Sequence, residues 1–227
     1  MTARTQVPVA TRRRLLVGLV GGAALTGFGT WARAGAQIEE PLANAVRGAL
    51  AAAVADDSPP RPAFDDIERR LDYLKWLGAM SGRLKRRKAD GVTRLEFLET
   101  VWYESKRAGL EPALVLGLIQ VESAFRKYAI SRAGARGYMQ VMPFWARLIG
   151  DGDPARLFHL QTNLRFGCVI LRHYLDMESG DLFRALGRYN GSLGRPEYPN
   201  AVLAMSRNWQ STVAPTRVSA AGVPAQR

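Results

Sequence analysis

The stretch that decides the fold runs from Leu110 to Met142 and reads LEPALVLGLIQVESAFRKYAISRAGARGYMQVM. Its first part predicts a helix, because Pro112 suits a first helical position and neither another proline nor a β-branched run interrupts residues 113–125. At about 100° per residue, Val115 and its apolar neighbours share one face with Glu122. Glu122 therefore occupies a position where an apolar side chain is expected.

A carboxylate on an apolar helix face is unfavourable by several kcal/mol if it is ionised. Glu122 is therefore expected to be hydrogen-bonded, protonated, or lining a cleft. The last two conditions describe a general acid whose pKa is raised by its surroundings. The alternative is a partly exposed residue near a helix end. Gly134 and Gly137 follow, where backbone can approach a ligand closely, and Gln140 can donate and accept hydrogen bonds.

Three short segments carry a resemblance to a known family. Gln-Val-Glu-Ser-Ala-Phe at 120–125, Gly-Tyr-Met-Gln-Val-Met-Pro at 137–143 and Arg-Tyr-Asn-Gly at 188–191 follow in order. They resemble the three successive motifs of the soluble lytic murein transglycosylase (SLT) domain family of the lysozyme-like superfamily. The resemblance covers about 100 residues, from Leu110 to Trp209.

The resemblance has two departures, and both are expected to alter the cleft wall. Tyr138 stands where the family usually has Leu, and Arg188 stands where it usually has Ala. The fold expected is all-α, or α with at most a minor β-hairpin. It comprises a lysozyme-like SLT domain with an N-terminal helical extension.

The chain divides into four expected parts. Residues 1–36 read as an export signal, residues 37–91 as a helical extension with a Pro-rich linker, residues 92–211 as the catalytic domain, and residues 212–227 as a disordered tail. The signal carries Thr-Arg-Arg-Arg-Leu-Leu at 11–16, which resembles a twin-arginine signal. Its apolar run is shorter than the about 20 residues of a membrane span.

The expected location is the periplasm, with the protein exported and either soluble or loosely associated with the envelope. Export by the general secretory route and an uncleaved anchor are the alternatives left open. The formal net charge is +12, and residues 1–34 carry five arginines and no acid, which leaves +7 for the rest. A basic surface suits nucleic acid or an anionic polymer such as the cell wall. No nucleic-acid module signature is found, so nucleic acid is not expected.

Several helix details follow from periodicity. A helix is expected between residues 64 and 88, with an inner face of Ile67, Leu71, Leu74 and Leu77. It ends in the basic run 83–88, which is expected to be a solvated last turn that complements the helix dipole. Contact with an anionic polymer or with a secretion-machine partner is the alternative for this run.

The helix starts are predicted from capping residues. Thr93 to Glu96 has the spacing of a capping box and predicts the start of a helix whose inner face includes Leu95. Thr162 or Asn163 is expected to cap the helix that carries Cys168, and Asp181 to begin the next one.

Cysteine and metal chemistry are not expected. Cys168 is the only cysteine, and it shares a helical stripe with Leu164, Leu171 and Leu175, as a buried small hydrophobe does. No cluster of ligand residues has metal-site spacing, so no metal and no cofactor are predicted.

The resemblance implies a one-carboxylate lyase acting on peptidoglycan glycan strands. Glu122 is the expected catalytic residue, as general acid and then base. The substrate-binding residues expected from the motifs are Ser123, Met139, Gln140, Tyr189, Asn190 and, more weakly, Tyr198. The structural alternatives are a Ser123 bonded to its own helix, a Met139 that fills the core, and a capped helix end at Asn190.

Two rival functions are open. A hydrolase like goose-type lysozymes would need a second carboxylate, and Asp151, Asp153 and Glu197 are the nearby candidates. A non-catalytic cell-wall glycan-binding or scaffold protein is the more distant alternative. The expected assembly is a monomer, with a cell-envelope or secretion-machinery partner as an option.

Overall fold

The computed structural model describes residues 44–55 and 62–211. These residues form eight α-helices and one short 3-10 helix, and they contain no strand beyond isolated β-bridges that join Arg136 to Ile130 and to Val141. The predicted all-α class is confirmed. The bounds are α1 Asn44–Ala55, α2 Ile67–Leu84, α3 Gly91–Arg107, α4 Pro112–Ser123, α5 Pro143–Ile149, η1 Pro154–Phe158, α6 Leu160–Met177, α7 Leu182–Asn190 and α8 Glu197–Arg207.

Some of the predicted features lie outside the described residues. The expected export signal at 1–36 and the expected tail at 212–227 are among them, and so is most of the Pro-rich linker. Within the described ranges, no helix is both long and apolar enough to cross a membrane.

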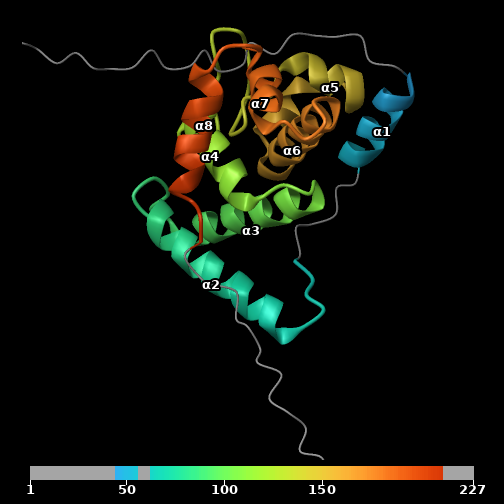
Figure 1. Ribbon diagram of the computed structural model, residues 1–227. Helices are drawn as coiled ribbons and strands as arrows, with labels where there is room; N and C mark the ends of the chain where they lie inside the picture. The colour runs from blue at the N-terminus through green and yellow to red at the C-terminus, as the bar shows by residue number, and fades with distance from the viewer. Residues whose placement is uncertain (1–43, 56–61, 212–227) are drawn as a thin grey trace, which may run out of the picture. The chain divides into compact units, whose positions relative to one another are not determined.

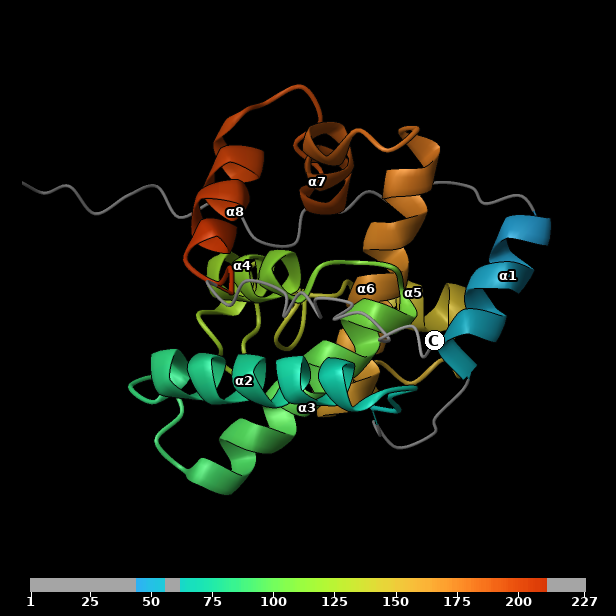
Figure 2. The same ribbon diagram turned by 60° about the horizontal axis from the view of Figure 1, so that its bottom comes forward.

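Helix α4, which carries Glu122, is mostly buried and packs against two other helices. Nine of its twelve residues are buried, and it lies against α8 on one side and α3 on another (Figures 1 and 2). The contact with α8 depends on Gly117, because a Cβ there would lie 2.6 Å from the Ser206 amide nitrogen and 2.7 Å from its Cα. The two backbones thus meet without an intervening side chain, which fixes α8 against the helix that carries Glu122.

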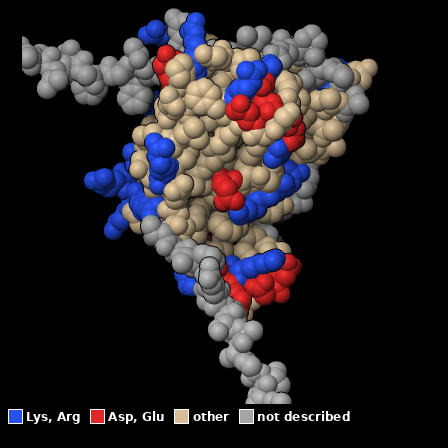
Figure 3. Space-filling view, in the orientation of Figure 1, with Lys and Arg blue, Asp and Glu red and all other residues tan. Residues whose placement is uncertain are grey.

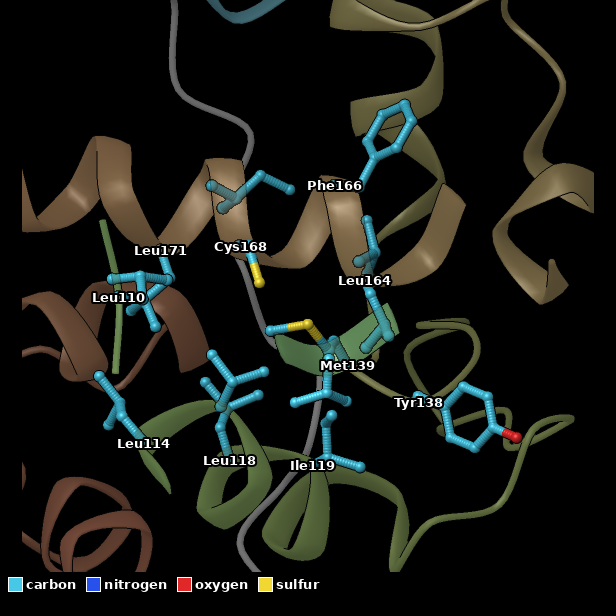
Figure 4. Packing of buried hydrophobic residues seen from close by; sticks show 14 of the residues in the cluster. Leu110, Leu114, Leu118, Ile119, Tyr138, Met139, Leu164, Phe166, Cys168 and Leu171 are labelled. Carbon is cyan, nitrogen blue, oxygen red and sulfur yellow. The ribbon is translucent and has the colours of Figure 1, made fainter. Parts of the chain in front are cut away.

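Helix α6 forms the other half of the core. Leu164, Cys168 and Leu171 point from it toward α4, and Met139 fills the space between the two helices (Figure 4). Leu164 and Leu171 are 0% exposed and Cys168 is 1% exposed, so the predicted stripe is confirmed. Helices α3 and α7 pack along the sides of α6.

The predicted inner face of α2 is wrong at three of its four residues, whereas Leu77 is half-buried and packs against the core. Ile67, Leu71 and Leu74 are 63%, 46% and 49% exposed, whereas the helix buries a different stripe. That buried stripe consists of Tyr73, Trp76, Met80 and Leu84. Aromatic packing explains the choice, because the Trp76 ring lies 4.7 Å from the Trp102 ring of α3 and large aromatic surfaces dominate core energetics.

Two predicted helix starts are also wrong. Helix α3 begins at Gly91, and its cap is Asp90, whose side chain accepts a hydrogen bond from the Thr93 amide. Leu95 is 40% exposed there, so it does not belong to the inner face. Helix α6 begins at Leu160, which places Asn163 inside the helix. The Asp181 cap of α7 is confirmed.

Candidate active site

Glu122 lies in the last turn of α4 and is 6% exposed. Helix α4 ends one residue later, and the chain then takes two successive left-handed conformations, with φ of 49° at Ala124 and 66° at Phe125. Non-glycine residues seldom adopt positive φ, and such strained backbone concentrates at functional sites. The carboxyl group therefore sits at a sharply turned helix end.

Tyr198 provides the hydrogen bond to this carboxyl group. Its hydroxyl donates to Glu122 Oε1 at 2.5 Å, and the ring is 2% exposed at the start of α8. The other oxygen, Oε2, has no hydrogen-bond partner among the described residues. One carboxyl oxygen is thus held by a hydrogen bond, and the other is buried without a partner in the described ranges.

Burial raises the pKa of Glu122 to about 8, although the hydrogen bond from Tyr198 acts to lower it. The loss of solvation is the larger effect, because a neutral hydroxyl compensates a buried charge only in part. At neutral pH the carboxyl group is therefore mostly protonated. The same burial raises the pKa of the Tyr198 hydroxyl well above its ordinary value, so Tyr198 stays a donor.

The turn at residues 137–140 is built on α6. Gly137 has a φ of 76°, and a Cβ on it would lie 2.4 Å from Asn163 Nδ2 and 2.5 Å from the Leu157 carbonyl oxygen. Asn163 is completely buried and accepts a hydrogen bond from the Met139 amide at 2.8 Å. Its Nδ2 donates to the carbonyls of Arg136 and Leu157. Sequence reasoning missed this role, although an Asn inside an apolar helix is the available signal.

Gln140 and Tyr189 stabilise the same turn. Gln140 has a φ of 49° and donates from Nε2 to the carbonyls of Gly137 at 2.8 Å and Ala129 at 3.1 Å. The Tyr189 hydroxyl donates to the Met139 carbonyl at 2.8 Å. Met139 thus has both backbone groups bonded and a side chain that is 0% exposed, so it fills the core (Figure 4).

Two further residues from the motifs lie close to helix ends. Ser123 Oγ donates to the Ile119 carbonyl at 3.2 Å, which is the local helix bond that such residues often make. Asn190 is 4% exposed and donates from Nδ2 to Ser192 Oγ at 3.0 Å. Its Oδ1 has no hydrogen-bond partner among the residues that the structure describes.

Both departures from the family pattern have structural partners. The Tyr138 hydroxyl accepts a hydrogen bond from Lys88 Nζ at 2.7 Å, and its ring packs 4.9 Å from that of Phe97. Arg188 forms an ion pair with Glu178. These contacts account for the two side chains without reference to a substrate.

The three candidates for a second carboxylate have other surroundings. Asp151 forms an ion pair with Arg156, and Asp153 accepts a hydrogen bond from the Ala155 amide at the start of η1. Glu197 is exposed in the first turn of α8. Burial and the Tyr198 hydrogen bond are the two causes of the pKa shift of Glu122, and neither is a neighbouring carboxylate.

The described residues hold no group of three or more His, Cys, Asp and Glu side chains arranged to bind a metal ion. Cys168 is buried, and burial raises the pKa of its thiol well above the ordinary value. A cavity of about 410 Å³ lies among α1, α5, η1 and α6, and Glu122 is not one of its lining residues.

Comparisons with known proteins agree on one family. Residues 99–200 match the family model described as Transglycosylase SLT domain. The chain is similar to a membrane-bound lytic murein transglycosylase C from Actinobacillus pleuropneumoniae, with 42% identity over 88 residues that cover 35% of this chain and 24% of the relative. It is also similar to a transglycosylase from Enterobacteria phage PRD1, with 33% identity over 104 residues that cover 46% of this chain and 38% of the relative.

Among solved structures, the chain resembles an inactive mutant of the lytic transglycosylase Slt from Pseudomonas aeruginosa. The TM-score is 0.45 and the sequence identity 20%, over 63% of this chain and 29% of that chain. The chain spans well under half the length of each of these proteins.

Proposed function

We propose, on the basis of the match between residues 99–200 and the family model described as Transglycosylase SLT domain, that the protein is a peptidoglycan lytic transglycosylase. It cleaves the β-1,4 bond between N-acetylmuramic acid and N-acetylglucosamine without water and leaves a 1,6-anhydro sugar. Glu122 is its single general acid and base.

The observation that supports this proposal most directly is the asymmetry of the Glu122 carboxyl group. Oε1 accepts the Tyr198 hydrogen bond, and Oε2 has no partner within the described residues. With a pKa of about 8, the carboxyl group carries a proton at neutral pH and can donate that proton to a substrate. A catalytic pKa near the operating pH is what general acid–base catalysis requires.

The reaction proceeds in two proton transfers. Protonated Glu122 gives its proton to the glycosidic oxygen as the C1–O4 bond breaks, and the 2-acetamido group of the muramic acid residue stabilises the developing positive charge. The C6 hydroxyl of the same sugar then attacks C1 and forms the C1–O6 bond. Its proton passes to the Glu122 carboxylate, which restores the acid. Each atom of the substrate is retained in the products, so the reaction is formally a lyase reaction.

The other residues from the motifs either contact the substrate or hold the site in its shape. Asn190 offers Oδ1 to a sugar N–H or hydroxyl, because that oxygen is buried without a partner among the described residues. Gln140 and Tyr189 hold the turn at residues 137–140 in place. Ser123 bonds its own helix in the absence of substrate, and its hydroxyl can instead donate to the acetamido carbonyl oxygen of the substrate. Met139 contributes to this site through its position in the core.

We assign the protein to the cell envelope, and within it to the periplasm, on the basis of the twin-arginine-like stretch at 11–16 and the cell-wall substrate. The substrate is the glycan strand of peptidoglycan, with the protein acting as a monomer.

The test is mass spectrometry of the products released from purified peptidoglycan by the full chain. The proposal predicts muropeptides lighter by one water than hydrolytic products. Glu122→Gln should lower the rate by about 10²- to 10⁴-fold, which is the range for loss of a general acid. Glu111→Gln is the matched control, because Glu111 is exposed at the opposite end of α4.

Products that carry the added water would favour a hydrolase, and Asp151→Asn, Asp153→Asn and Glu197→Gln would then identify its second carboxylate. Binding without cleavage by the unaltered chain would favour a glycan-binding role instead. Either result contradicts the proposal.

A further inference from the structure

A surface made only of basic side chains borders the Glu122 helix end. Its members come from the last turn of α2, from the residues that follow that helix and from the segment that follows α4, and all six are exposed. In Figure 3 the Lys and Arg side chains gather at the left, over the end of α2, with no Asp or Glu among them. We call this the cationic surface, and it consists of Arg83, Lys85, Arg86, Arg87, Arg126 and Lys127.

The two segments of the cationic surface are joined by direct contacts. The Arg87 guanidinium lies 5.7 Å from the centre of the Phe125 ring. Arg126 donates from Nε to the carbonyl of Ser123, the residue that follows Glu122. Burial lowers the pKa of the Lys88 ammonium group, and the nearby charge of Lys127 lowers it further. The cationic surface therefore extends from the end of α2 to Arg126, which is four residues after Glu122 in the sequence.

Lys88 fixes the end of α2 to the turn at residues 137–140. Its ammonium group lies 4.8 Å from the centre of the Phe97 ring and 4.7 Å from that of Tyr138, and it donates a hydrogen bond to the Tyr138 hydroxyl. Cation–π contacts of this kind strengthen as the cation becomes desolvated. Lys88 thus fixes the backbone next to the basic side chains. This backbone lies beside the turn that contains Tyr138, Met139 and Gln140.

The six charges lack acidic partners in the described part of the chain. Arg156, Arg172 and Arg184 each form an ion pair with a nearby acid, but no such pair includes a member of the cationic surface. Arg83 instead donates to the backbone carbonyls of Asn208 and Gln210. The charge of one acid, Glu96, reaches the adjacent Lys88. Adjacent like charges oppose folding, so such a surface is typical of binding to an anionic partner.

We propose that the cationic surface binds the carboxylates of the peptide stems of peptidoglycan while the glycan strand lies at Glu122. This inference rests on the proposed function, because the strand must be the substrate for its stems to reach the surface. Peptidoglycan carries much of its negative charge on these stems, and the surface begins four residues beyond the proposed acid. Contacts between exposed charges act mainly on association and weaken as salt is added.

The test uses two versions of one probe. Peptidoglycan sacculi are compared with the same sacculi after their carboxylates have been converted to neutral methylamides. Binding is measured by sedimentation with Glu122→Gln as the background, so that cleavage does not consume the probe. Adding Lys85→Gln and Arg86→Gln should weaken binding to untreated sacculi by about three- to tenfold at low salt.

The matched control adds Arg70→Gln and Arg147→Gln, which remove the same charge from exposed positions outside the surface. The control pair should change binding by less than about twofold, and methylamidated sacculi should not distinguish the two pairs. Equal losses from both pairs, or a loss that persists on methylamidated sacculi, would overturn the inference. So would tight binding to phosphatidylglycerol vesicles that Lys85→Gln and Arg86→Gln abolish while sacculus binding is unchanged.

A separate measurement tests the proposed function independently of the cationic surface. Products released from methylamidated sacculi by the chain with Glu122 intact report on the chemistry, because those sacculi lack the carboxylates that the surface binds. Anhydro products with no effect of Lys85→Gln and Arg86→Gln on binding would reject the surface alone.

Discussion

Two buried glutamates occupy comparable positions in two regions of the core and have opposite surroundings. Glu104 on α3 is 1% exposed and meets Arg165 of α6, which donates from Nη2 at 2.8 Å and from Nε at 3.2 Å. Arg107 adds a second cation at 3.8 Å. Glu122 on α4 is 6% exposed, and within the described ranges its carboxyl group has one hydrogen-bond partner, the hydroxyl of Tyr198.

The difference shows how a fold separates a structural carboxylate from a reactive one. A buried charge that faces an opposite charge with good geometry is compensated, and breaking such a pair is strongly destabilising. A buried carboxyl group that receives one neutral hydrogen bond keeps its proton instead. Glu104 therefore joins α3 to α6, whereas Glu122 is available for chemistry.

The largest expected effect is on the stability of the Glu104 region. Glu104→Gln leaves Arg165 as a buried charge without its main partner, so the free energy of unfolding should fall by about 3 to 5 kcal/mol in urea denaturation. Replacing both residues, with Glu104→Leu and Arg165→Met, should recover most of this loss. A loss below about 1 kcal/mol for Glu104→Gln would mean that the pair is not a structural element.

The next effect concerns the contact that brings Tyr198 to Glu122. Gly117→Ala places a Cβ against the backbone of Ser206, which a side-chain movement cannot relieve. The free energy of unfolding should fall by about 2 to 3 kcal/mol, as in overpacked cores, and cleavage should weaken as α8 moves. Gly78→Ala is the matched control, because nothing lies within 4 Å of its added Cβ. It should be neutral or slightly stabilising, and equal losses at both glycines would contradict the interpretation.

Glu122→Gln should stabilise the protein while removing its activity. The folded pKa of Glu122, about 8, lies above its ordinary value of 4.5. The contribution of the protonated group is therefore fully present below about pH 4.5 and is lost as the pH rises toward 8. The gain from Glu122→Gln should grow over that window and reach about 3 kcal/mol at pH 7, measured by thermal unfolding across pH. The exposed Glu111→Gln should show no such trend, and a pH-independent gain for Glu122→Gln would contradict the raised pKa.

The smallest effect is expected from Tyr198→Phe. The Tyr198 hydrogen bond lowers the pKa of Glu122, so its loss should raise that pKa further and move the alkaline limb of the rate profile to higher pH. The rate should fall about tenfold, in line with one hydrogen bond. Tyr103→Phe on α3 is the control. A limb that moves to lower pH would show that Tyr198 does not act on Glu122 in this way.

The sequence was sufficient for the helical class and for the position of Glu122 on the apolar face of its helix, whereas the burial of its carboxyl group is known only from the structure. The same pattern of a polar residue on an apolar face is present at Glu104, where Phe97 and Val101 precede it at helical spacing on the buried face. Periodicity alone does not separate the two glutamates. The separation depends on Arg165 and Tyr198, which are 61 and 76 residues away along the chain.

Two of the errors have a common cause in tertiary contacts. The inner face of α2 was mispredicted because the Trp76 ring packs against the Trp102 ring. The spacing of the leucines does not reveal that contact. Asn163 was predicted to cap α6, whereas its side chain satisfies the backbone of a turn more than 20 residues away. Long-range hydrogen bonds of this kind are not visible in local capping patterns.

The most direct test of the account is a titration of the Glu122 carboxyl group by carbon-13 NMR. The full chain is labelled at its glutamate side-chain carboxyl carbons, and the signal is assigned by its absence in Glu122→Gln. We expect a titration midpoint near pH 8, as burial without a cationic partner requires. A midpoint near the ordinary value of 4.5 would show that Glu122 is ionised at neutral pH, and the proposed role as general acid would then be wrong.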